Sequence, residues 1–296
     1  HYDASLSEIF FDELGIPSPS YNLEVGSASH SEQVAKIMIR FEEFCQKNAV
    51  DIVLVVGDVN STIATGMVAK KLNKQLVHVE AGLRSYDRTM PEEINRLATD
   101  AITDLFFTTE PEATTNLIRE GHDQSKLHYV GHVMIDNLYY QLKKVGADYV
   151  PKNEKVNFFK NNLASKYIVM TMHRPSNVDQ KTVLESNLES IRIAALKAPI
   201  LFSCHPRTYQ KIHEFNLEGY FTSLKPVSRI ENQIYLVDSL SYNDFLWLWK
   251  DAALVLTDSG GLQEETTALK VPCVTMRKNT ERPITCAEGT NYLLQG

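Results

Sequence analysis

Near the C-terminus a predicted strand, a glycine pair and a predicted helix follow one another, an arrangement suited to binding phosphate. The apolar run of residues 253–256 predicts a buried strand, and residues 262–269 predict a helix. Ser259, Gly260 and Gly261 lie between them. A helix that begins at the carboxyl end of a strand offers free backbone N–H groups and the positive end of its dipole to an anion. The three residues are therefore predicted to bind phosphate, although an ordinary strand–turn–helix connection has the same pattern.

Three charged residues near this turn are further candidates for ligand contacts. Glu265 falls in the first turn of the predicted helix, where its carboxylate could reach sugar hydroxyls or simply interact with the helix dipole. Arg277 and Arg282 lie beyond the last predicted strand, where they could pair with phosphate or remain exposed to solvent. The residues alone leave both readings open.

Three carboxylates in the first half could act as general acid and base. Asp58 and Glu80 directly follow predicted strands, and Glu92 opens a predicted helix. Asp58 could merely cap a helix, and Glu92 alone is more typical of a first-turn acid. Glu80 lies at the rim of a buried strand, where carboxylates are rarely placed without a partner. Desolvation and mutual repulsion would separate the pKa values of grouped acids, which favours acid–base catalysis by the set.

His173 and Arg174 follow a predicted strand in the second half. A single histidine in such a place is more often structural than catalytic. Together with the carboxylates and the phosphate turn, however, the pair favours proton abstraction and return on a phosphate-linked substrate. No set of His, Cys and Asp has the spacing of a metal site, so we predict neither a metal nor another cofactor.

Short apolar runs alternate with helical patterns throughout, which is typical of parallel sheets wrapped by helices. Predicted strands cover residues 52–56, 75–79, 105–108, 127–130, 167–171, 200–203, 234–237, 253–256 and 273–276. Predicted helices cover residues 5–11, 32–46, 62–72, 92–102, 112–119, 182–196, 208–215, 244–250 and 262–269. The polar, lysine-rich stretch 141–166 separates the halves. We expect an N-terminal Rossmann-like domain, 1–145, that lacks its first strand and carries the acids, and a C-terminal Rossmann-like domain, 146–296, facing it across a cleft.

The composition of the chain limits the classes of partner and the cellular setting that we expect. The 296 residues carry 30 basic and 37 acidic side chains, a net charge of -7, which argues against a nucleic-acid partner. No run approaches the about 18 apolar residues of a membrane span. The 4 cysteines are scattered, which is typical of a reduced, cytoplasmic setting. The chain begins at His1 and stops at Gly296 just after an apolar run, so we expect both ends to be cuts through a fold.

At this point the sequence resembles the non-hydrolysing UDP-N-acetylglucosamine 2-epimerases. The matching segments, in order, are GDVNST at 57–62, HVEAGLR at 78–84, PEEINR at 91–96, VG at 130–131, HR at 173–174, TDSGGLQEE at 257–265 and TERP at 280–283. The combination of HVEAGLR with DSGGLQEE is highly specific for this group. The resemblance implies a GT-B-like fold. It also implies interconversion of UDP-N-acetylglucosamine and UDP-N-acetylmannosamine, by elimination of UDP to a 2-acetamidoglucal and its re-addition, in polysaccharide biosynthesis.

The resemblance also implies roles for particular residues. Asp58, Glu80 and Glu92 resemble the acid–base carboxylates, and His173 resembles the histidine near the diphosphate. The implied substrate contacts are Arg84, Arg174, Ser259, Gly260, Gly261, Glu265 and Arg282, with Glu265 at the ribose and Arg282 at a phosphate. Members are often dimers, and residues 10–11 or the region around Trp247 could supply an apolar contact.

Some features differ from the family pattern and leave alternatives open. The family opens with a strand and a turn that this chain lacks, and it closes with helices beyond Gly296. Residues 173–177 read HRPSN instead of the HRREN of many bacterial members. The HRP form also occurs in relatives that act on diacetamido uronic acid nucleotides. A GT-B glycosyltransferase, a hydrolysing epimerase and a domain pair that binds UDP without catalysis remain as further alternatives.

Overall fold

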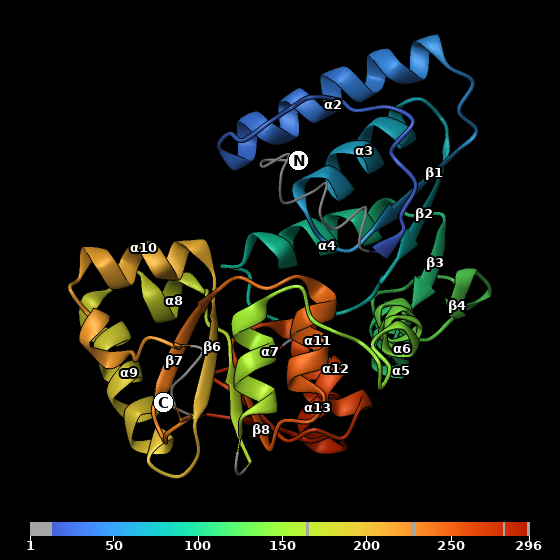
Figure 1. Ribbon diagram of the computed structural model, residues 1–296. Coiled ribbons are helices and arrows are strands. Elements are labelled where there is room, and N and C mark those ends of the chain that lie inside the picture. Colours follow the sequence, from blue (N-terminus) through green and yellow to red (C-terminus); the bar gives the residue numbers. More distant parts are fainter. Residues whose placement is uncertain (1–13, 164–165, 226–228, 281, 295–296) are drawn as a thin grey trace. The chain divides into compact units, whose positions relative to one another are not determined.

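The computed structural model describes residues 14–163, 166–225, 229–280 and 282–294, which form two compact units (Figure 1). One unit is built on Gly15–Val133 and the other on Met134–Gly296. The helix predicted at residues 5–11, and the apolar contact predicted at residues 10–11, lie outside the described residues. No helix within the described ranges is long and apolar enough to cross a membrane.

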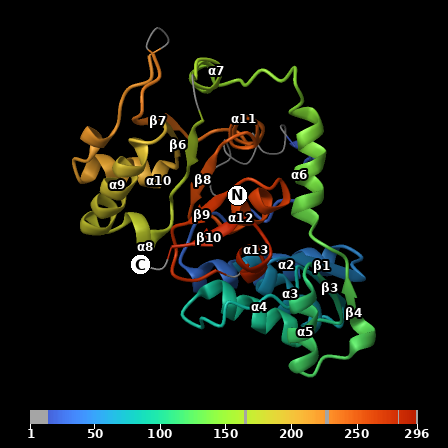
Figure 2. The same cartoon turned by 90° about the horizontal axis from the view of Figure 1, so that it is seen from below.

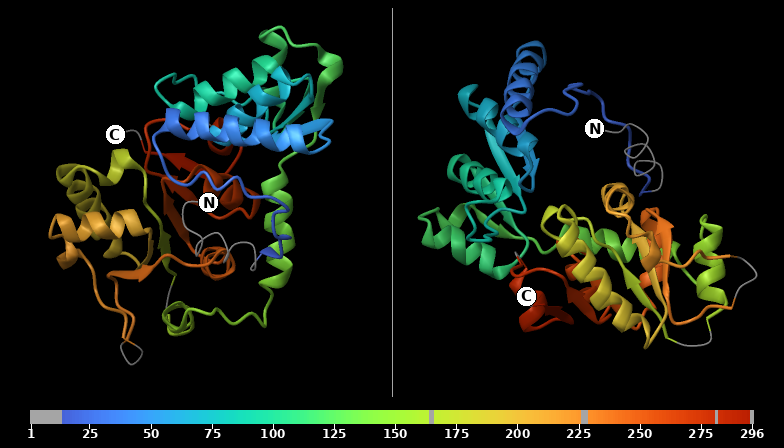
Figure 3. Two further views of the ribbon diagram at one scale, coloured as in Figure 1. Left: turned by 90° about the horizontal axis from the view of Figure 1, so that it is seen from above. Right: turned by 90° about the vertical axis from the view of Figure 1, so that its left-hand side faces the viewer.

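The first unit is a four-stranded parallel sheet, in the order β1-β2-β3-β4, with helices between its strands. Its elements are α2 (His30–Lys47), β1 (Ile52–Val56), α3 (Asn60–Lys71), β2 (Gln75–Val79), α4 (Pro91–Ile102), β3 (Leu105–Thr108), α5 (Pro111–Arg119), η1 (Gln124–Lys126) and β4 (Leu127–Tyr129). Helix α2 packs against α3, as the further views show (Figure 3). Because the strands are parallel, the residues that follow β1 and β2 lie at the same edge of the sheet.

The second unit is a six-stranded parallel sheet, in the order β10-β9-β8-β5-β6-β7. Its elements are α6 (Val133–Lys144), α7 (Glu154–Asn161), β5 (Ile168–Met170), α8 (Pro175–Val178), α9 (Lys181–Ala195), β6 (Ile200–Cys204), α10 (Pro206–Glu214), η2 (Glu218–Tyr220), β7 (Ile234–Asp238), α11 (Tyr242–Trp249), β8 (Leu254–Thr257), α12 (Gly260–Ala268), β9 (Cys273–Thr275), α13 (Pro283–Ala287) and β10 (Asn291–Leu293). The strands lie between α9 and α10 on one face and α7 and α11 on the other (Figure 2).

Side chains that point alternately to the two faces of the six-stranded sheet explain why helices cover both faces. Val169 and Leu201 pack into the apolar cluster that contains Trp249 of α11, whereas Met170 and Phe202 pack into the cluster under α9 and α10. Successive side chains of a strand point to opposite faces, so one apolar strand serves two cores. The sheet is therefore covered on both faces, as expected for a Rossmann-like unit.

The stretch 141–166, proposed from its composition as the boundary between the halves, is partly helical. It contains the end of α6 and the whole of α7, whose Val156 and Phe159 are fully buried. The two apolar residues are three apart and share one helix face, while the lysines around them stay outside. Trp247 is also buried within this core, under the ammonium of Lys160.

Candidate active site

Glu80 follows β2 in an uncommon backbone conformation. Its φ is +67°, in the left-handed region that side chains with a Cβ avoid at a cost of roughly 1–2 kcal/mol. The Glu80 N–H donates to the Phe107 carbonyl at 3.0 Å, and the Glu80 carbonyl accepts from Arg96. Gly57 leaves room for the side chain, since a Cβ there would lie 3.1 Å from Glu80 Oε2. Backbone strain of this kind is typical of functional positions.

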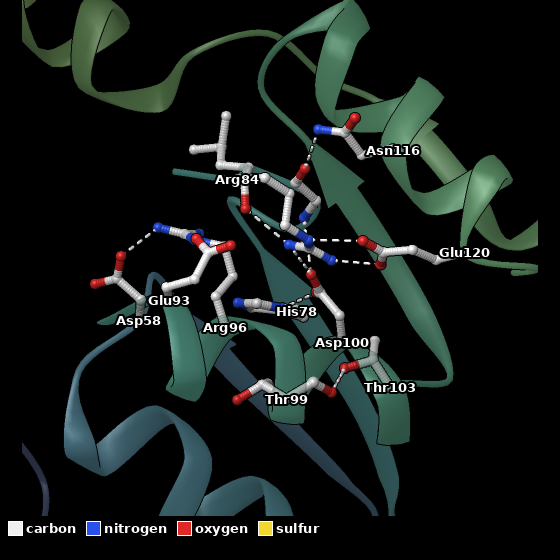
Figure 4. Close-up of polar contacts among 12 residues, drawn as sticks. Asp58, His78, Arg84, Glu93, Arg96, Thr99, Asp100, Thr103, Asn116 and Glu120 are labelled. Carbon is white, nitrogen blue, oxygen red and sulfur yellow. Dashed lines mark hydrogen bonds and ion pairs between the residues drawn. The ribbon is translucent and has the colours of Figure 1, made fainter. Parts of the chain in front are cut away.

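Asp58 is joined to Glu80 through one guanidinium. Arg96 Nη2 donates to Asp58 Oδ2 at 2.5 Å (Figure 4). The same Nη2 lies 3.7 Å from Glu80 Oε2. The Asp58 carbonyl accepts from Asn95 Nδ2 at 2.9 Å. Asp58 is not a helix cap, because α3 has Val59 at its N-cap and no side-chain cap bond. The structure therefore brings two of the three predicted acids together on Arg96.

The third predicted acid, Glu92, differs sharply from its neighbour Glu93. Glu92 is half-buried in the first turn of α4, and its side chain forms no hydrogen bond or ion pair with other residues of the described chain. Glu93 is buried, and its carboxylate accepts from Ser85 N at 2.8 Å, Ser85 Oγ at 2.9 Å and Tyr86 N at 3.2 Å. Glu93 therefore anchors the loop before α4, whereas the Glu92 carboxylate is left for other partners.

A buried polar network supports this edge of the sheet. His78 is fully buried; its Nδ1 donates to Asp100 Oδ1 at 2.7 Å and its Nε2 donates to the Gly57 carbonyl at 2.9 Å. Asp100 Oδ2 accepts from Gly82 N at 3.1 Å. Burial alone would raise the pKa of Asp100, but the hydrogen bond and charge of His78 and the guanidinium of Arg84 lower it. The network thus fixes Gly57, which directly precedes Asp58, and Gly82, two residues after Glu80.

Arg84 belongs to the same network. Figure 4 shows its guanidinium between Asp100, at 2.7 Å, and Glu120, at 2.6 Å. Its side chain is only 1% exposed. Burial lowers the pKa of Arg84, but the two carboxylates outweigh burial and raise it. With its donors occupied inside the unit, Arg84 has a geometry that favours a structural role over the substrate contact predicted from sequence.

In the second unit, α12 begins at the predicted phosphate-binding turn. Ser259 is its N-cap residue but makes no side-chain cap bond; instead Ser259 N donates to Thr257 Oγ1 at 3.0 Å. The N–H groups of the first turn are thus not taken by a cap. A Cβ on Gly260 would meet nothing within 4 Å, whereas one on Gly261 would lie 3.2 Å from Met134 Cε. This geometry is suited to close approach of a phosphate.

His173 lies beside this turn, held by Asp258. The Asp258 carboxylate is fully buried and accepts from His173 Nδ1 at 2.9 Å, from His173 N at 3.0 Å and from Arg174 N at 2.8 Å. The Arg174 Nε is buried without a hydrogen bond in the described part of the chain. Asp258 directly precedes Ser259, so the structure brings His173 and Arg174 to the start of α12.

Glu265 and Arg282 are buried and paired with neighbours. Glu265 Oε1 accepts from the Tyr242 hydroxyl at 2.7 Å, and burial together with Glu265 raises the pKa of Tyr242 well above its usual range. Tyr242 is therefore a neutral donor. Arg282 Nε lies 3.2 Å from Glu264 Oε1. Sequence reasoning missed Tyr242, whose partner is 23 residues away and leaves no signal in the local pattern.

Other supporting residues were also missed, although some signals were present. Arg96 stands four residues after Glu92 on one helix, and Asp258 stands inside the glycine motif. Their partners come from other elements and could not be identified from spacing. Within the described residues, no group of three His, Cys, Asp or Glu side chains is arranged to hold a metal ion.

Comparison with known proteins identifies the family. The family model described as UDP-N-acetylglucosamine 2-epimerase matches residues 1–296. A UDP-N-acetylglucosamine 2-epimerase of Methanocaldococcus jannaschii is 44% identical over 298 residues, which cover 99% of this chain and 78% of that protein. The chain belongs to the UDP-N-acetylglucosamine 2-epimerase family. The family and the isomerase class predicted from the motifs are confirmed.

Solved structures of this epimerase family agree with the fold. The crystal structure of the Methanocaldococcus jannaschii UDP-GlcNAc 2-epimerase in complex with UDP-GlcNAc and UDP matches with a TM-score of 0.84 at 43% identity, covering 99% of this chain and 78% of that one. The Neisseria meningitidis enzyme bound to UDP-GlcNAc matches with a TM-score of 0.84 at 25% identity, covering 99% and 77%. The predicted α/β, GT-B-like class with parallel sheets is confirmed.

A relative with a different named substrate is also similar. The UDP-2,3-diacetamido-2,3-dideoxy-D-glucuronate 2-epimerase of Pseudomonas aeruginosa is 36% identical over 301 residues, covering 99% of this chain and 77% of that protein. Both named activities are 2-epimerisations of a UDP-linked acetamido sugar.

Proposed function

We propose that this epimerase inverts C2 of UDP-N-acetylglucosamine to give UDP-N-acetylmannosamine, with no cofactor. The observation that carries the proposal is the pair of carboxylates, Asp58 and Glu80, held on one guanidinium at the carboxyl ends of neighbouring strands. In a member of this family, such a pair supplies groups that can remove and return a proton. The family match and the similar UDP-GlcNAc 2-epimerase support the substrate.

The proposed reaction has two half-steps whose atoms balance. A carboxylate takes the C2 proton while the C1–O bond breaks, and its electrons leave with UDP; a C1–C2 double bond remains in the 2-acetamidoglucal. UDP then adds back to C1 and a carboxylic acid returns a proton to the opposite face of C2. Asp58, Glu80 and Glu92 are the proposed acids and bases. Glu92 suits proton transfer because no neighbour in the described chain occupies its carboxylate.

We assign the binding of UDP to the second unit. The first turn of α12, with Ser259, Gly260 and Gly261, would hold the diphosphate through backbone N–H groups. His173, Arg174 and Arg282 would add charge where negative charge develops on the departing oxygen. Glu265, oriented by Tyr242, would accept from ribose hydroxyls. Donors preorganised in this way stabilise the leaving group without reorganisation during the reaction.

A second candidate substrate is the UDP-diacetamido uronic acid sugar. The 36% identity to the Pseudomonas aeruginosa enzyme favours testing it. Both substrates share the UDP group and the 2-acetamido carbon, so the same acids would serve either one. A cytoplasmic site of action fits four unpaired cysteine thiols, and a homodimer is the assembly that we expect.

The proposal is tested by NMR of UDP-N-acetylglucosamine incubated with the protein in heavy water. We expect deuterium at C2 of both epimers and no net release of UDP. The same incubation with the diacetamido uronic acid nucleotide compares the two candidate substrates through kcat/KM. Inverted product without solvent deuterium would overturn the proposed proton transfer. Persistent stoichiometric UDP would indicate a hydrolysing epimerase, and turnover only with an added acceptor alcohol would indicate a glycosyltransferase.

A further inference from the structure

We propose that Asp258 is a positioning residue that fixes the tautomer and direction of the His173 imidazole. The catalytic consequence rests on the proposed role of His173 at the diphosphate, whereas the tautomer follows from the geometry of the second unit. Asp258 directly follows β8, and His173 follows β5, the neighbouring strand of the sheet. The contact therefore joins two adjacent strand ends.

Four donor groups converge on the Asp258 carboxylate, which is fully buried. Oδ2 accepts from Arg174 N at 2.8 Å, from Asn177 Nδ2 at 3.0 Å and from His173 N at 3.0 Å. Oδ1 faces His173 Nδ1 at 2.9 Å and shares the His173 N–H, at 3.1 Å. The pKa of Asp258 is lowered: burial alone would raise it, but His173 and the other donors outweigh burial. The group is thus an anion that only accepts.

An acceptor-only partner at 2.9 Å requires a hydrogen on His173 Nδ1. In the neutral ring Nε2 is then the bare acceptor, on a side chain that is 33% exposed. The ring can take a proton at Nε2 and present it to a diphosphate oxygen, while the buried carboxylate keeps the ring in place through Nδ1–H. Asp258 touches neither reacting atom in this scheme, so it acts through His173.

The neighbouring His205 provides an internal contrast. Its ring centroid lies 5.6 Å from that of His173, and its Nδ1 accepts from Arg207 N at 3.2 Å as the N-cap of α10. Its proton is therefore on Nε2. Burial, and then the charges of His173 and Arg207, lower the pKa of His205. The two adjacent rings are thus expected to hold opposite tautomers. The charged or titratable groups that face them are Asp258, Arg207 and, for each ring, the other histidine.

The substitution Asp258→Asn separates the tautomer from the backbone anchor. The amide oxygen can take the place of Oδ2 and keep its donors from His173 N, Arg174 N and Asn177. The amide N–H₂ then replaces Oδ1 and donates to His173 Nδ1. The ring must carry its proton on Nε2 instead. The His173 N–H gives up its longer contact to Oδ1, at 3.1 Å, but the three contacts at the Oδ2 position hold the loop while the tautomer is inverted.

Long-range ¹H–¹⁵N NMR of the nitrogen-labelled protein reads the tautomers directly. The 9 histidines are assigned by difference, with His173→Asn and His205→Asn proteins. At a pH where the rings are neutral, we expect an Nδ1–H signature for His173 in the wild type and an Nε2–H signature in Asp258→Asn, while His205 stays unchanged. An Nε2–H signature for His173 in the wild type would overturn the proposal without requiring any variant to fold.

A double-mutant cycle tests the catalytic consequence. By analogy with a wrong-tautomer histidine, we expect Asp258→Asn to lower kcat by about 10²–10⁴-fold with a smaller change in KM. In a His173→Asn background the same change should alter kcat by less than about 3-fold, because its route of action is gone. Equal losses in both backgrounds would show a merely structural role. The expected tautomers with no loss of activity would contradict the role of His173 and leave the tautomer assignment intact.

Discussion

The adjacent residues Glu92 and Glu93 of α4 are expected to affect different properties when each is changed to glutamine: activity for Glu92 and stability for Glu93. Glu92 has no partner in the described chain, whereas Glu93 is buried and accepts three hydrogen bonds from Ser85 and Tyr86. The two side chains have equal length and lie on one helix turn. Glu92→Gln and Glu93→Gln are therefore matched controls for each other.

The cost of Glu93→Gln follows from its hydrogen bonds. An amide oxygen in place of Oε2 keeps both bonds from Ser85, but an amide nitrogen in place of Oε1 faces the N–H of Tyr86. The Tyr86 N–H loses its acceptor, and because Tyr86 is 69% exposed, water can take the place of that acceptor; the net loss is about 0.5–1.5 kcal/mol. A loss of about 2–4 °C in Tm for each kcal/mol predicts a Tm lower by roughly 1–6 °C. Glu92→Gln, on a half-buried side chain, should change stability by less than about 0.5 kcal/mol.

Activity should follow the reverse order. Removal of a general acid or base lowers kcat by about 10²–10⁴-fold, which we expect for Glu92→Gln. Glu93→Gln should retain most of its kcat below its melting transition. Thermal unfolding by circular dichroism and NMR of C2 inversion measure the two quantities on the same preparations. An active, wild-type-like Glu92→Gln together with a stable, inactive Glu93→Gln would refute the assignment.

Further predictions concern single contacts. Tyr242→Phe removes the donor to Glu265, a hydrogen bond of about 0.5–1.5 kcal/mol, and should weaken UDP binding by about 2–10-fold. Calorimetric titration measures this affinity, with inorganic pyrophosphate, which has no ribose, as the control ligand. Unchanged UDP affinity would contradict the prediction. Glu80→Gly should be more stable than Glu80→Ala by about 1 kcal/mol in urea unfolding, because residue 80 has a φ of +67°. Both proteins should be inactive. A more stable alanine protein would argue against backbone strain at this position. The pKa of Asp100 is lowered from its ordinary value of 3.8, so the ionised carboxylate stabilises the fold at pH values above 3.8, and this stabilisation is lost as the pH falls below 3.8. The stability of the wild type should therefore fall more steeply with acid than that of Asp100→Asn. Equal slopes would contradict the ionic network.

Strand positions could be predicted well because each strand is a short apolar run with polar residues at its ends. The predicted bounds of β1, β2 and β3 agree with the structure, since Gly57, Glu80 and neighbouring turn residues mark the ends clearly. Helix α7 could not be predicted from composition, because its lysines and asparagines conceal the apolar pair that packs into the core. Burial by the tertiary fold overrides local polarity there.

Candidate acids could be found from motifs, but not the residues that position them. Arg96 bonds to Asp58 across 38 residues, and Asp258 bonds to the backbone of His173 across 85. Pairing at such distances depends on strand order, which a single sequence does not specify. The left-handed φ of Glu80 likewise has no local signal, because glutamate is not a residue that usually adopts it. Motifs therefore indicate the chemistry, and the sheet determines the geometry.

Cleavage of the C1–O bond is measured most directly by positional isotope exchange. UDP-N-acetylglucosamine with ¹⁸O in the bridge between C1 and the β-phosphorus is incubated with the protein, and the label is followed by ³¹P NMR. Elimination of UDP frees the β-phosphoryl group to rotate before re-addition, so we expect ¹⁸O to move into the non-bridging positions of both epimers. Inverted product with its label wholly retained in the bridge would contradict elimination and require a route that leaves C1–O intact.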